Sequence, residues 1–334
     1  MYKIKTLKRM ANKNKKTLVS VVITAYNIEN YIEECLNSVF GQTYSNIEVI
    51  VVCDKPTDRT CDVVHKVCDG RKNAYIIEND HNVGAGMARK IGVDASRGDF
   101  VMTVDGDDIV RPDFIESLVN NAEKTGADIV SGGITIMKGD GTLSETVYGE
   151  EVLEGYDRIV KYWGSNIVYV NNKIIKRELY NKIEYCTRPY IEDTSVIIPL
   201  LWYAKTVSYI NNPGYVYRMR GDSLTHQTNA LKDFIYKTLS WCDLMEFFNE
   251  KDPKFFEVSN LRGWIVDVIK MLNNSYLVEK EIDMYKDEWC EVMRRLINLI
   301  SIDKISYKII TFNQPQQQPQ PQPPQQEIKG VVKL

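Results

Sequence analysis

The feature that most constrains this chain is an alternation of short, β-branched apolar runs with segments whose apolar residues recur at helical spacing. Strands buried on both faces read as continuous apolar runs, and each run here is followed within a few residues by a helix-like segment. This order predicts an α/β fold whose sheet is mostly parallel and flanked by helices. The predicted strands are 18–24, 48–53, 74–77, 100–104 and 127–131, and the helices between them are 28–40, 58–68, 86–95 and 112–124.

Polar segments follow the strands at the edge where open parallel sheets bind their ligands. They span residues 24–27, 54–60, 81–89 and 105–108. Asp105 and Asp107 come directly after an apolar strand, with Gly106 between them. Two carboxylates so placed can converge on one Mg²⁺ or Mn²⁺, because these cations prefer oxygen ligands and usually share them with substrate phosphates. We therefore expect the chemistry to lie at this edge of the sheet.

The alternation loosens after Gly132. The sequence KGDGT at 138–142 predicts a turn between two strands. A helix at 191–203 and short strands at 206–211 and 215–219 follow. Helical spacing then continues from 229 to 303. We divide the chain into a basic, flexible N-terminal tail at 1–16, an α/β domain at 17–228, a helical C-terminal region at 229–312 and a Gln/Pro-rich, disordered tail at 313–334.

The net charge and the cysteine content limit which partners and which cellular compartment we expect for this chain. The net charge of −3 does not call for nucleic acid as a partner. The 7 cysteines contain no CxxC pair, and their odd number favours a reducing cytoplasm. No apolar run approaches the roughly 18 residues of a membrane span. The basic tail would either make peripheral contact with an anionic membrane surface or remain a solvated segment.

Four ordered motifs resemble those of the inverting glycosyltransferases of family 2, which have the GT-A fold. The matching segments are VVITAYN at 21–27, VVCDKPTDRT at 51–60, NVGAGMARKIG at 82–92 and GDFVMTVDGDDIVRPDF at 98–114. Their order and spacing agree over about 95 residues. The resemblance implies a GT-A, Rossmann-like sheet that is mixed but mostly parallel, with 17–228 as the catalytic domain and a helical C-terminal appendage.

The resemblance also implies roles for residues at the sheet edge. Thr24 and Tyr26 would line the base and ribose of a nucleotide. Asp54 would accept a hydrogen bond from the uracil N–H. Asp105 would lie near the ribose and the metal, and Asp107 would ligate the divalent cation directly.

Other matching positions leave alternatives open. Gly84 and Arg89 match the loop that approaches the nucleotide, although an ion pair along its own helix would also explain Arg89. Asp108 is explained about as well by helix capping. The chain departs from the family pattern at Lys55-Pro56, where relatives have Gly-Ser, and at Lys90, where they have Asn.

Two downstream motifs complete the resemblance. Glu192-Asp193 matches a family Glu-Asp pair at a helix start, where the aspartate serves as general base on the acceptor hydroxyl. Capping of the helix is the alternative. Arg218 and Arg220 match the family's Y-R-x-H-x-x-S motif and would clamp a diphosphate. Many relatives have His at the position of Arg220, and since Arg cannot ligate a cation, we expect this residue to contact phosphate.

The resemblance implies an inverting hexosyl- or N-acetylhexosaminyltransferase that uses a UDP-sugar donor, Mn²⁺ or Mg²⁺, and a glycan, lipid-linked or polymer-precursor acceptor. A dinucleotide-binding oxidoreductase is excluded, because Thr24-Ala25-Tyr26 and Arg89 stand where its fingerprint needs glycine. A catalytically weak or inactive partner subunit of another transferase is the second interpretation. The retention of Asp105, Asp107 and Asp193 argues against it. A homo-oligomer stays open.

Overall fold

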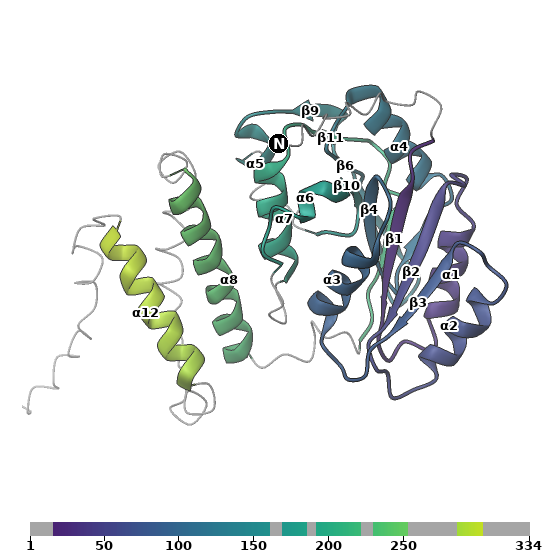
Figure 1. Cartoon of the computed structure of the whole chain (residues 1–334), viewed down its shortest axis with the longest axis horizontal. Coiled ribbons are helices and arrows are strands. Elements are labelled where there is room, and N and C mark those ends of the chain that lie inside the picture. The colour runs from purple at the N-terminus through teal and green to yellow at the C-terminus, as the bar shows by residue number, and fades with distance from the viewer. Residues whose placement is uncertain (1–15, 161–168, 186–191, 222–229, 253–285, 303–334) are drawn as a thin grey trace, which may run out of the picture.

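The structure is a computed structural model that describes residues 16–160, 169–185, 192–221, 230–252 and 286–302 (Figure 1). The predicted basic tail up to residue 15, the Gln/Pro-rich tail, and the predicted helical spacing at 253–285 lie outside these residues. So do Tyr190 and Ile191, which precede the Glu-Asp pair, and the side chain of Glu192.

The described residues contain an eight-stranded sheet in the order β3-β2-β1-β4-β10-β6-β11-β9. At its centre, β1 (Val19–Ala25) pairs in parallel with β2 (Ile47–Cys53) on one side and β4 (Phe100–Asp105) on the other. β3 (Ala74–Glu78) extends this parallel part beyond β2. β2 is buried along its whole length, Glu48 included, as its largely apolar sequence predicts. The predicted α/β fold with a mostly parallel sheet is confirmed.

An antiparallel strand that the sequence did not reveal interrupts the parallel order. β10 (Lys173–Lys176) lies between β4 and β6 (Ile129–Ser131) and runs antiparallel to both. The fifth predicted strand therefore does not neighbour the fourth. Beyond β6, β11 (Val207–Tyr209) pairs in parallel and β9 (Glu151–Leu153) ends the sheet antiparallel.

Helices cover both faces of the parallel part (Figure 1). α1 (Ile32–Phe40), α2 (Thr60–Cys68) and α4 (Phe114–Thr125) contribute to one apolar cluster with alternate residues of β1 and β2. α3 (Ala85–Ala95) packs against the opposite face, where the side chains of Val22, Ile50 and Val52 lie. Period-2 alternation explains this division, because successive side chains of a strand point to opposite faces.

Three of these helices begin later than predicted, and for α1 and α2 the reason is that loop contacts occupy the backbone before them. The amide of Ile28 donates to Thr60 Oγ1 over 2.9 Å, and that of Glu29 donates to Asp58 Oδ2 over 3.1 Å. These bonds join the loops after β1 and β2, so α1 starts at Ile32 and α2 at Thr60.

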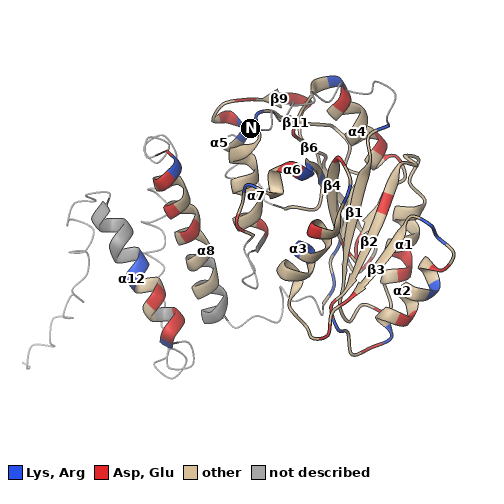
Figure 2. Ribbon diagram, in the orientation of Figure 1, with Lys and Arg blue, Asp and Glu red and all other residues tan. Residues whose placement is uncertain are grey.

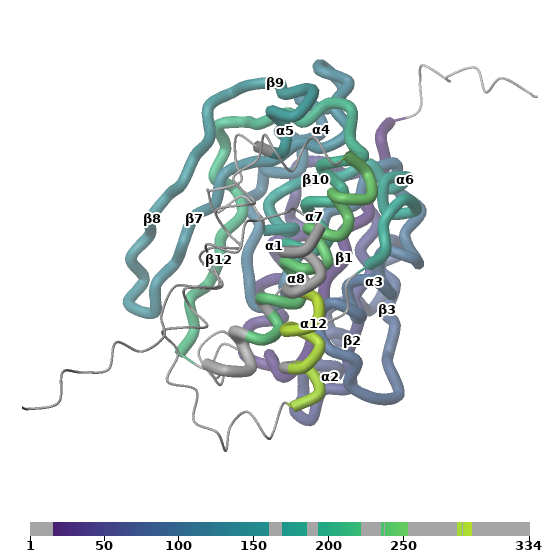
Figure 3. The backbone as a smooth tube through the Cα atoms, turned by 90° about the vertical axis from the view of Figure 1, so that its left-hand side faces the viewer, coloured from purple at the N-terminus to yellow at the C-terminus, as the bar shows by residue number. Residues whose placement is uncertain are grey.

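A second, four-stranded sheet runs in the order β5-β12-β7-β8 and stands beside the first (Figure 3). The predicted turn at 138–142 is confirmed, since it joins β7 (Ile134–Met137) to β8 (Leu143–Thr146). β12 (Tyr215–Arg218) pairs in parallel with β7 and antiparallel with β5 (Ile109–Val110). Since β5 begins directly after Asp108, this pairing brings β12 beside the Asp105–Asp108 segment.

The remaining described helices are α5 (Asp157–Val160), α6 (Arg177–Tyr180), α7 (Glu192–Tyr203), α8 (Ala230–Lys251) and α12 (Lys286–Ile302). α7 packs on α8, and α8 on α12. Arg295 on α12 contacts Asp243 and Glu246 on α8 at 2.8 and 2.5 Å. The helical character of the C-terminal region is confirmed for α8 and α12.

Charged residues are sparse on the central strands and denser on α1, α2, α8 and α12, which lie on the outside of the fold (Figure 2). Among the described residues, none of the helices combines the length and hydropathy that crossing a bilayer requires.

Candidate active site

A tight turn at the end of β4 presents Asp105 and Asp107. The amide of Asp108 donates to the carbonyl of Asp105 over 2.9 Å, and the amide of Gly106 donates to the Thr24 carbonyl over 3.1 Å. A Cβ at Gly106 would lie 2.7 Å from that same carbonyl oxygen and 2.5 Å from Ile28 Cδ1. Only glycine fits between the two aspartates, because β4 lies so close to the end of β1.

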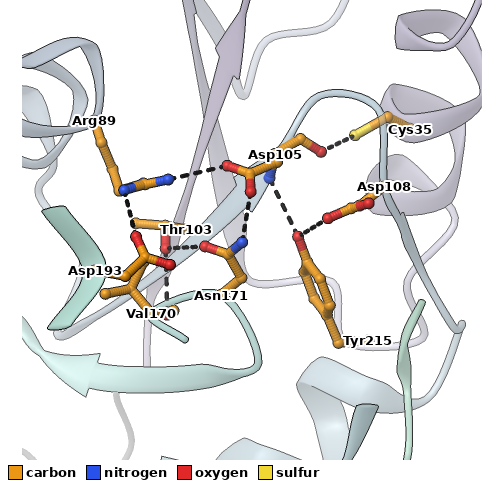
Figure 4. A network of polar contacts seen from close by, with 9 residues as sticks. All are labelled: Cys35, Arg89, Thr103, Asp105, Asp108, Val170, Asn171, Asp193 and Tyr215. Atoms are coloured by element: carbon orange, nitrogen blue, oxygen red, sulfur yellow. Dashed lines mark hydrogen bonds and ion pairs between the residues drawn. The ribbon is translucent and has the colours of Figure 1, made fainter. Parts of the chain in front are cut away.

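Arg89 joins two carboxylates that lie far apart in the sequence (Figure 4). Its Nη1 donates to Asp193 Oδ1 over 2.9 Å, and its Nη2 donates to Asp105 Oδ1 over 3.1 Å. The guanidinium is buried, with 4% of the side chain exposed. Neither partner belongs to α3, so these two contacts are not the ion pair along its own helix that the sequence left open.

Asn171 holds the other oxygen of Asp105 (Figure 4). Its Nδ2 donates to Asp105 Oδ2 over 2.7 Å, while its Oδ1 accepts from Thr103 Oγ1 over 3.2 Å. The side chain is buried just before β10. Sequence reasoning missed this residue, because Asn171 belongs to none of the recognised motifs. Its contact with Asp105 depends on the pairing of β10 with β4, which the sequence did not predict.

Asp193 lies in the first turn of α7, and its carboxylate faces Arg89. Burial raises the pKa of this carboxyl above its usual range, the Arg89 guanidinium opposes that rise, and the charge of Asp105 adds to it. The side chain remains 27% exposed, so one face of it is open to solvent. A carboxylate held by an arginine yet still accessible can take a proton from a bound hydroxyl.

Lys173 is buried on β10 near Asp193. Its Nζ donates to Asn172 Oδ1 over 2.5 Å and to the carbonyl of Tyr169. Burial lowers the pKa of this amine to about 7, against the opposing charge of Asp193.

Two arginines from the end of β12 surround Asp107. Arg220 Nε lies 2.7 Å from Asp107 Oδ2. Arg218 Nε donates to the Asp107 carbonyl over 2.9 Å, and its Nη2 pairs with Glu34 Oε2 at 2.6 Å. Both guanidiniums lie over the ring of Tyr31, at 5.3 Å for Arg218 and 5.0 Å for Arg220. The positive charge expected from the Arg-x-Arg motif therefore lies directly at the second aspartate.

The donor chemistry of this turn fits a divalent cation. Asp105 and Asp107 lie on either side of Gly106 in one tight turn, and burial together with the charge of Asp105 raises the pKa of the Asp107 carboxyl. Among the described residues, no group of three or more His, Cys, Asp or Glu side chains is arranged to hold a metal ion. Asp105 and Asp107 could hold Mg²⁺ or Mn²⁺ in the common arrangement in which substrate phosphates supply further oxygens.

Asp108 is not a helix cap, which corrects the alternative that the sequence left open. Its Oδ2 accepts from the Tyr215 hydroxyl over 2.6 Å, and its Oδ1 accepts from the Arg218 amide over 2.9 Å. The residue is 1% exposed, and burial together with the charges of Asp105 and Asp107 raises the pKa of its carboxyl well above the usual range. Asp108 therefore ties β12 to the turn after β4.

Asp54 organises the loop expected to meet the nucleotide base. Its Oδ1 accepts from Asn79 Nδ2 at 2.7 Å and from the Val83 amide at 2.9 Å, and its Oδ2 accepts from the Gly84 amide at 2.9 Å. Gly84 has φ +84°, the region that favours glycine. A carboxylate has about four acceptor positions, so these three bonds leave one on Oδ2.

The other predicted nucleotide contacts lie at the ends of β1 and β2. Thr24 is half-buried opposite Asp105 in the strand register, and Tyr26 is 41% exposed just beyond β1. Lys55 has φ +54°, a left-handed conformation, at the position where the family pattern has glycine. The departure at Lys55 therefore keeps the backbone shape that a glycine would adopt more easily.

Known proteins are similar to this chain in sequence. The model of glycosyl transferase family 2 matches residues 20–184. Glycosyltransferase GlyG of Streptococcus pneumoniae serotype 4 is 27% identical over 288 residues, covering 81% of this chain and 93% of GlyG. Glycosyltransferase GlyA of the same organism is 27% identical over 226 residues, which cover 62% of this chain but only 31% of GlyA.

A solved structure shows the same fold. S. aureus TarS 1-349 in complex with UDP-GlcNAc superposes with a TM-score of 0.61 at 20% identity, covering 87% of this chain and 82% of that chain. The family model and the glycosyltransferase relatives place residues 20–184 of this chain in glycosyl transferase family 2, and the TarS superposition shows that the fold is GT-A.

Proposed function

We propose that this chain transfers a sugar from a UDP-sugar to a hydroxyl acceptor with inversion at the anomeric carbon. The observation that carries the proposal is the Arg89 guanidinium, which holds Asp105 and Asp193 at one edge of the sheet. Asp105 belongs to the turn suited to a cation and a diphosphate. Asp193 is partly exposed and would face the acceptor. A TarS structure that contains UDP-GlcNAc supports a UDP-linked hexose or N-acetylhexosamine as donor.

The donor end of the site would be built by the loops after β1, β2 and β3. Thr24 and Tyr26 would line the base and ribose. The acceptor position left on Asp54 Oδ2 would take the uracil N–H, while Gly84 would let the backbone approach the nucleotide. The three hydrogen bonds that Asp54 accepts would hold its carboxylate in one orientation toward the base.

Asp105 and Asp107 would hold Mn²⁺ or Mg²⁺ together with the diphosphate oxygens. When bound, the cation neutralises charge that develops on the departing diphosphate. Arg218 and Arg220 would donate to the phosphate oxygens, because a guanidinium fork matches their geometry. With the leaving group stabilised in this way, the chain needs no general acid on that side.

Asp193 would accept the proton of the acceptor hydroxyl as the new bond forms. A single displacement requires one base opposite the leaving group, and a raised pKa brings this carboxyl nearer to the working pH. Arg89 keeps the carboxylate ionised and oriented. The acceptor would be a glycan, a lipid-linked oligosaccharide or a polymer precursor, and the basic tail would favour peripheral contact with the cytoplasmic membrane face.

The test combines two variants with the product's configuration. We expect Asp193→Asn to lose about 10²–10⁴-fold in kcat while keeping its affinity for UDP with Mn²⁺. Asp107→Ala should lose kcat as well, together with its affinity for Mn²⁺ alone. The control, Asp69→Asn, removes an exposed carboxylate at the end of α2 and should behave as the parent. NMR of the product should show a β-linkage from an α-linked donor.

Full turnover by Asp193→Asn, or retention of configuration, would contradict the mechanism. A parent chain that binds UDP-sugars but neither transfers nor hydrolyses any of a nucleotide-sugar panel would favour the alternative of an inactive partner subunit.

A further inference from the structure

We propose that Arg220 is a built-in counter-ion of Asp107 that competes with the divalent cation for this carboxylate and allows UDP to bind without metal. The inference rests on the proposed function and deepens it, because it concerns how the same site neutralises a diphosphate. It follows from the contact between Arg220 Nε and Asp107 Oδ2, at 2.7 Å.

The position of Arg220 is fixed by its surroundings. Its side chain is only 13% exposed, and that of Asp107 is 20% exposed, so the pair is largely withdrawn from water. The Tyr31 ring packs beneath Arg220 at 5.0 Å and beneath Arg218 at 5.3 Å. Arg218 is in turn anchored by Glu34 and by the Asp107 carbonyl. The two guanidiniums are therefore both held over the same tyrosine ring.

The charges at the turn explain why Arg220 takes this position. Asp105 and Asp107 carry two negative charges on one tight turn, and Arg220 Nε, 2.7 Å from Asp107 Oδ2, compensates the second of them. Arginine stays protonated at any working pH, so it supplies this compensation permanently. A cation that binds Asp107 must share or displace the guanidinium.

The positive charge of Arg220 remains useful after a cation displaces its guanidinium from Asp107. A guanidinium that leaves Asp107 can donate to the phosphate oxygens of UDP while remaining next to Tyr31 and Arg218. A histidine at the same position would act in the opposite direction, since a neutral imidazole is a metal ligand and brings no fixed charge. Arg220 should therefore weaken the dependence of UDP binding on metal.

The experiment measures two equilibria in the full chain without turnover. Calorimetry gives the Kd of UDP in excess EDTA and in saturating Mn²⁺, and electron paramagnetic resonance gives the Kd of Mn²⁺ alone. We expect the parent to bind UDP in EDTA within about tenfold of its affinity in Mn²⁺. Arg220→Gln should bind UDP in EDTA at least about tenfold more weakly, as loss of a charged hydrogen bond implies. The same variant should bind Mn²⁺ alone more tightly, because the competitor is gone.

Three further variants separate this effect from unfolding or a general change in charge. Arg220→Lys keeps the charge and should bind Mn²⁺ alone as weakly as the parent. Arg220→His should widen the gap between the two UDP affinities. Arg111→Gln removes the guanidinium that pairs with Glu145 at 2.7 Å and should alter neither equilibrium.

The outcomes distinguish this inference from the proposed function. UDP binding by the parent in Mn²⁺ but not in EDTA would overturn the inference and leave the function intact. So would an Arg220→Gln variant whose Mn²⁺ affinity equals the parent's. Failure of the parent to bind UDP under both conditions would overturn both proposals.

Discussion

Arg89 Nη1 donates a 2.9 Å hydrogen bond to Asp193 Oδ1, although 104 positions separate the two residues in the sequence. Arg89 comes from the helix after β3, and Asp193 from the first turn of α7. The contact joins α3, in the part of the fold that carries the four recognised motifs, to α7, which carries the proposed base. It also makes the ionisation of Asp193 depend on a residue outside its own helix.

The first prediction concerns the pH dependence of transfer in Arg89→Gln. Arg89 opposes the rise in the pKa of Asp193, so its removal should raise that pKa further. A general base works only when deprotonated, and activity falls as pH drops through its pKa. The acid limb of the kcat–pH profile should therefore move to higher pH.

The control for this prediction is Arg97→Gln, which removes a guanidinium paired with Glu48 near the start of β2 and should leave the profile in place. A uniform loss of rate in Arg89→Gln, with an unmoved acid limb, would mean that Arg89 does not set the ionisation of the base.

The second prediction concerns Asn171→Ala. The amide of Asn171 donates to Asp105 Oδ2 at 2.7 Å, and hydrogen bonds to charged groups contribute about 1.5–3 kcal/mol. We expect the Kd of UDP with Mn²⁺ to rise roughly ten- to hundredfold by calorimetry. Asn171→Asp should bind more weakly still, because it places a second negative charge against Asp105.

Asn73→Ala is the matched control, since it removes another side-chain amide bond, to the Ile47 carbonyl, at the far end of the strands. UDP affinity in Asn171→Ala equal to that of this control would show that Asn171 does not position Asp105 for the donor.

The parallel part of the fold was predictable because its signal is local. β1 (VSVVITA) and β2 (IEVIVVC) are largely apolar runs rich in β-branched residues, which favour a strand buried on both faces. β10 gave no such signal, since its four residues begin and end with lysine. The two lysines are accommodated by contacts that the sequence does not reveal: Lys176 Nζ contacts the distant Asp128 Oδ1 at 2.6 Å, and Lys173 donates to its neighbours Asn172 and the Tyr169 carbonyl.

The candidate site was predictable in its residue types more than in its contacts. The motifs indicated Asp105, Asp107 and Asp193, and the structure places Arg89 between the first and the last of these. The contact of Arg220 with Asp107 could not be read from spacing, because it depends on the pairing of β12 with β5. The burial of Asp108 depends on that same pairing.

The third prediction concerns recognition of the base. Cytosine N3 is an acceptor where uracil has an N–H, so CDP would face Asp54 with two acceptors opposed and unpaired. Such a mismatch costs about 1–3 kcal/mol, and the Kd of CDP should exceed that of UDP by roughly five- to 150-fold. dTDP should bind like UDP at this contact, because thymine carries the same N–H. Equal affinities for UDP and CDP in calorimetry would exclude Asp54 as the reader of the base.

The last prediction concerns stability in Lys173→Met. Burial lowers the pKa of Lys173 to about 7 in the folded chain, against an ordinary value of 10.5. Between these values the folded chain holds this amine neutral, while the unfolded chain keeps it protonated. The parent's free energy of unfolding should therefore gain about 1.4 kcal/mol per pH unit from this residue above about pH 7, and methionine contributes no such gain. Any stability advantage of Lys173→Met should thus shrink as pH rises, in denaturant unfolding at about pH 7, 8 and 9.

Lys72→Met, at an exposed position, should show a constant difference from the parent. A constant difference for Lys173→Met as well would mean that this amine is charged in the folded chain across that range, with Asp193 and the Tyr169 carbonyl compensating its burial.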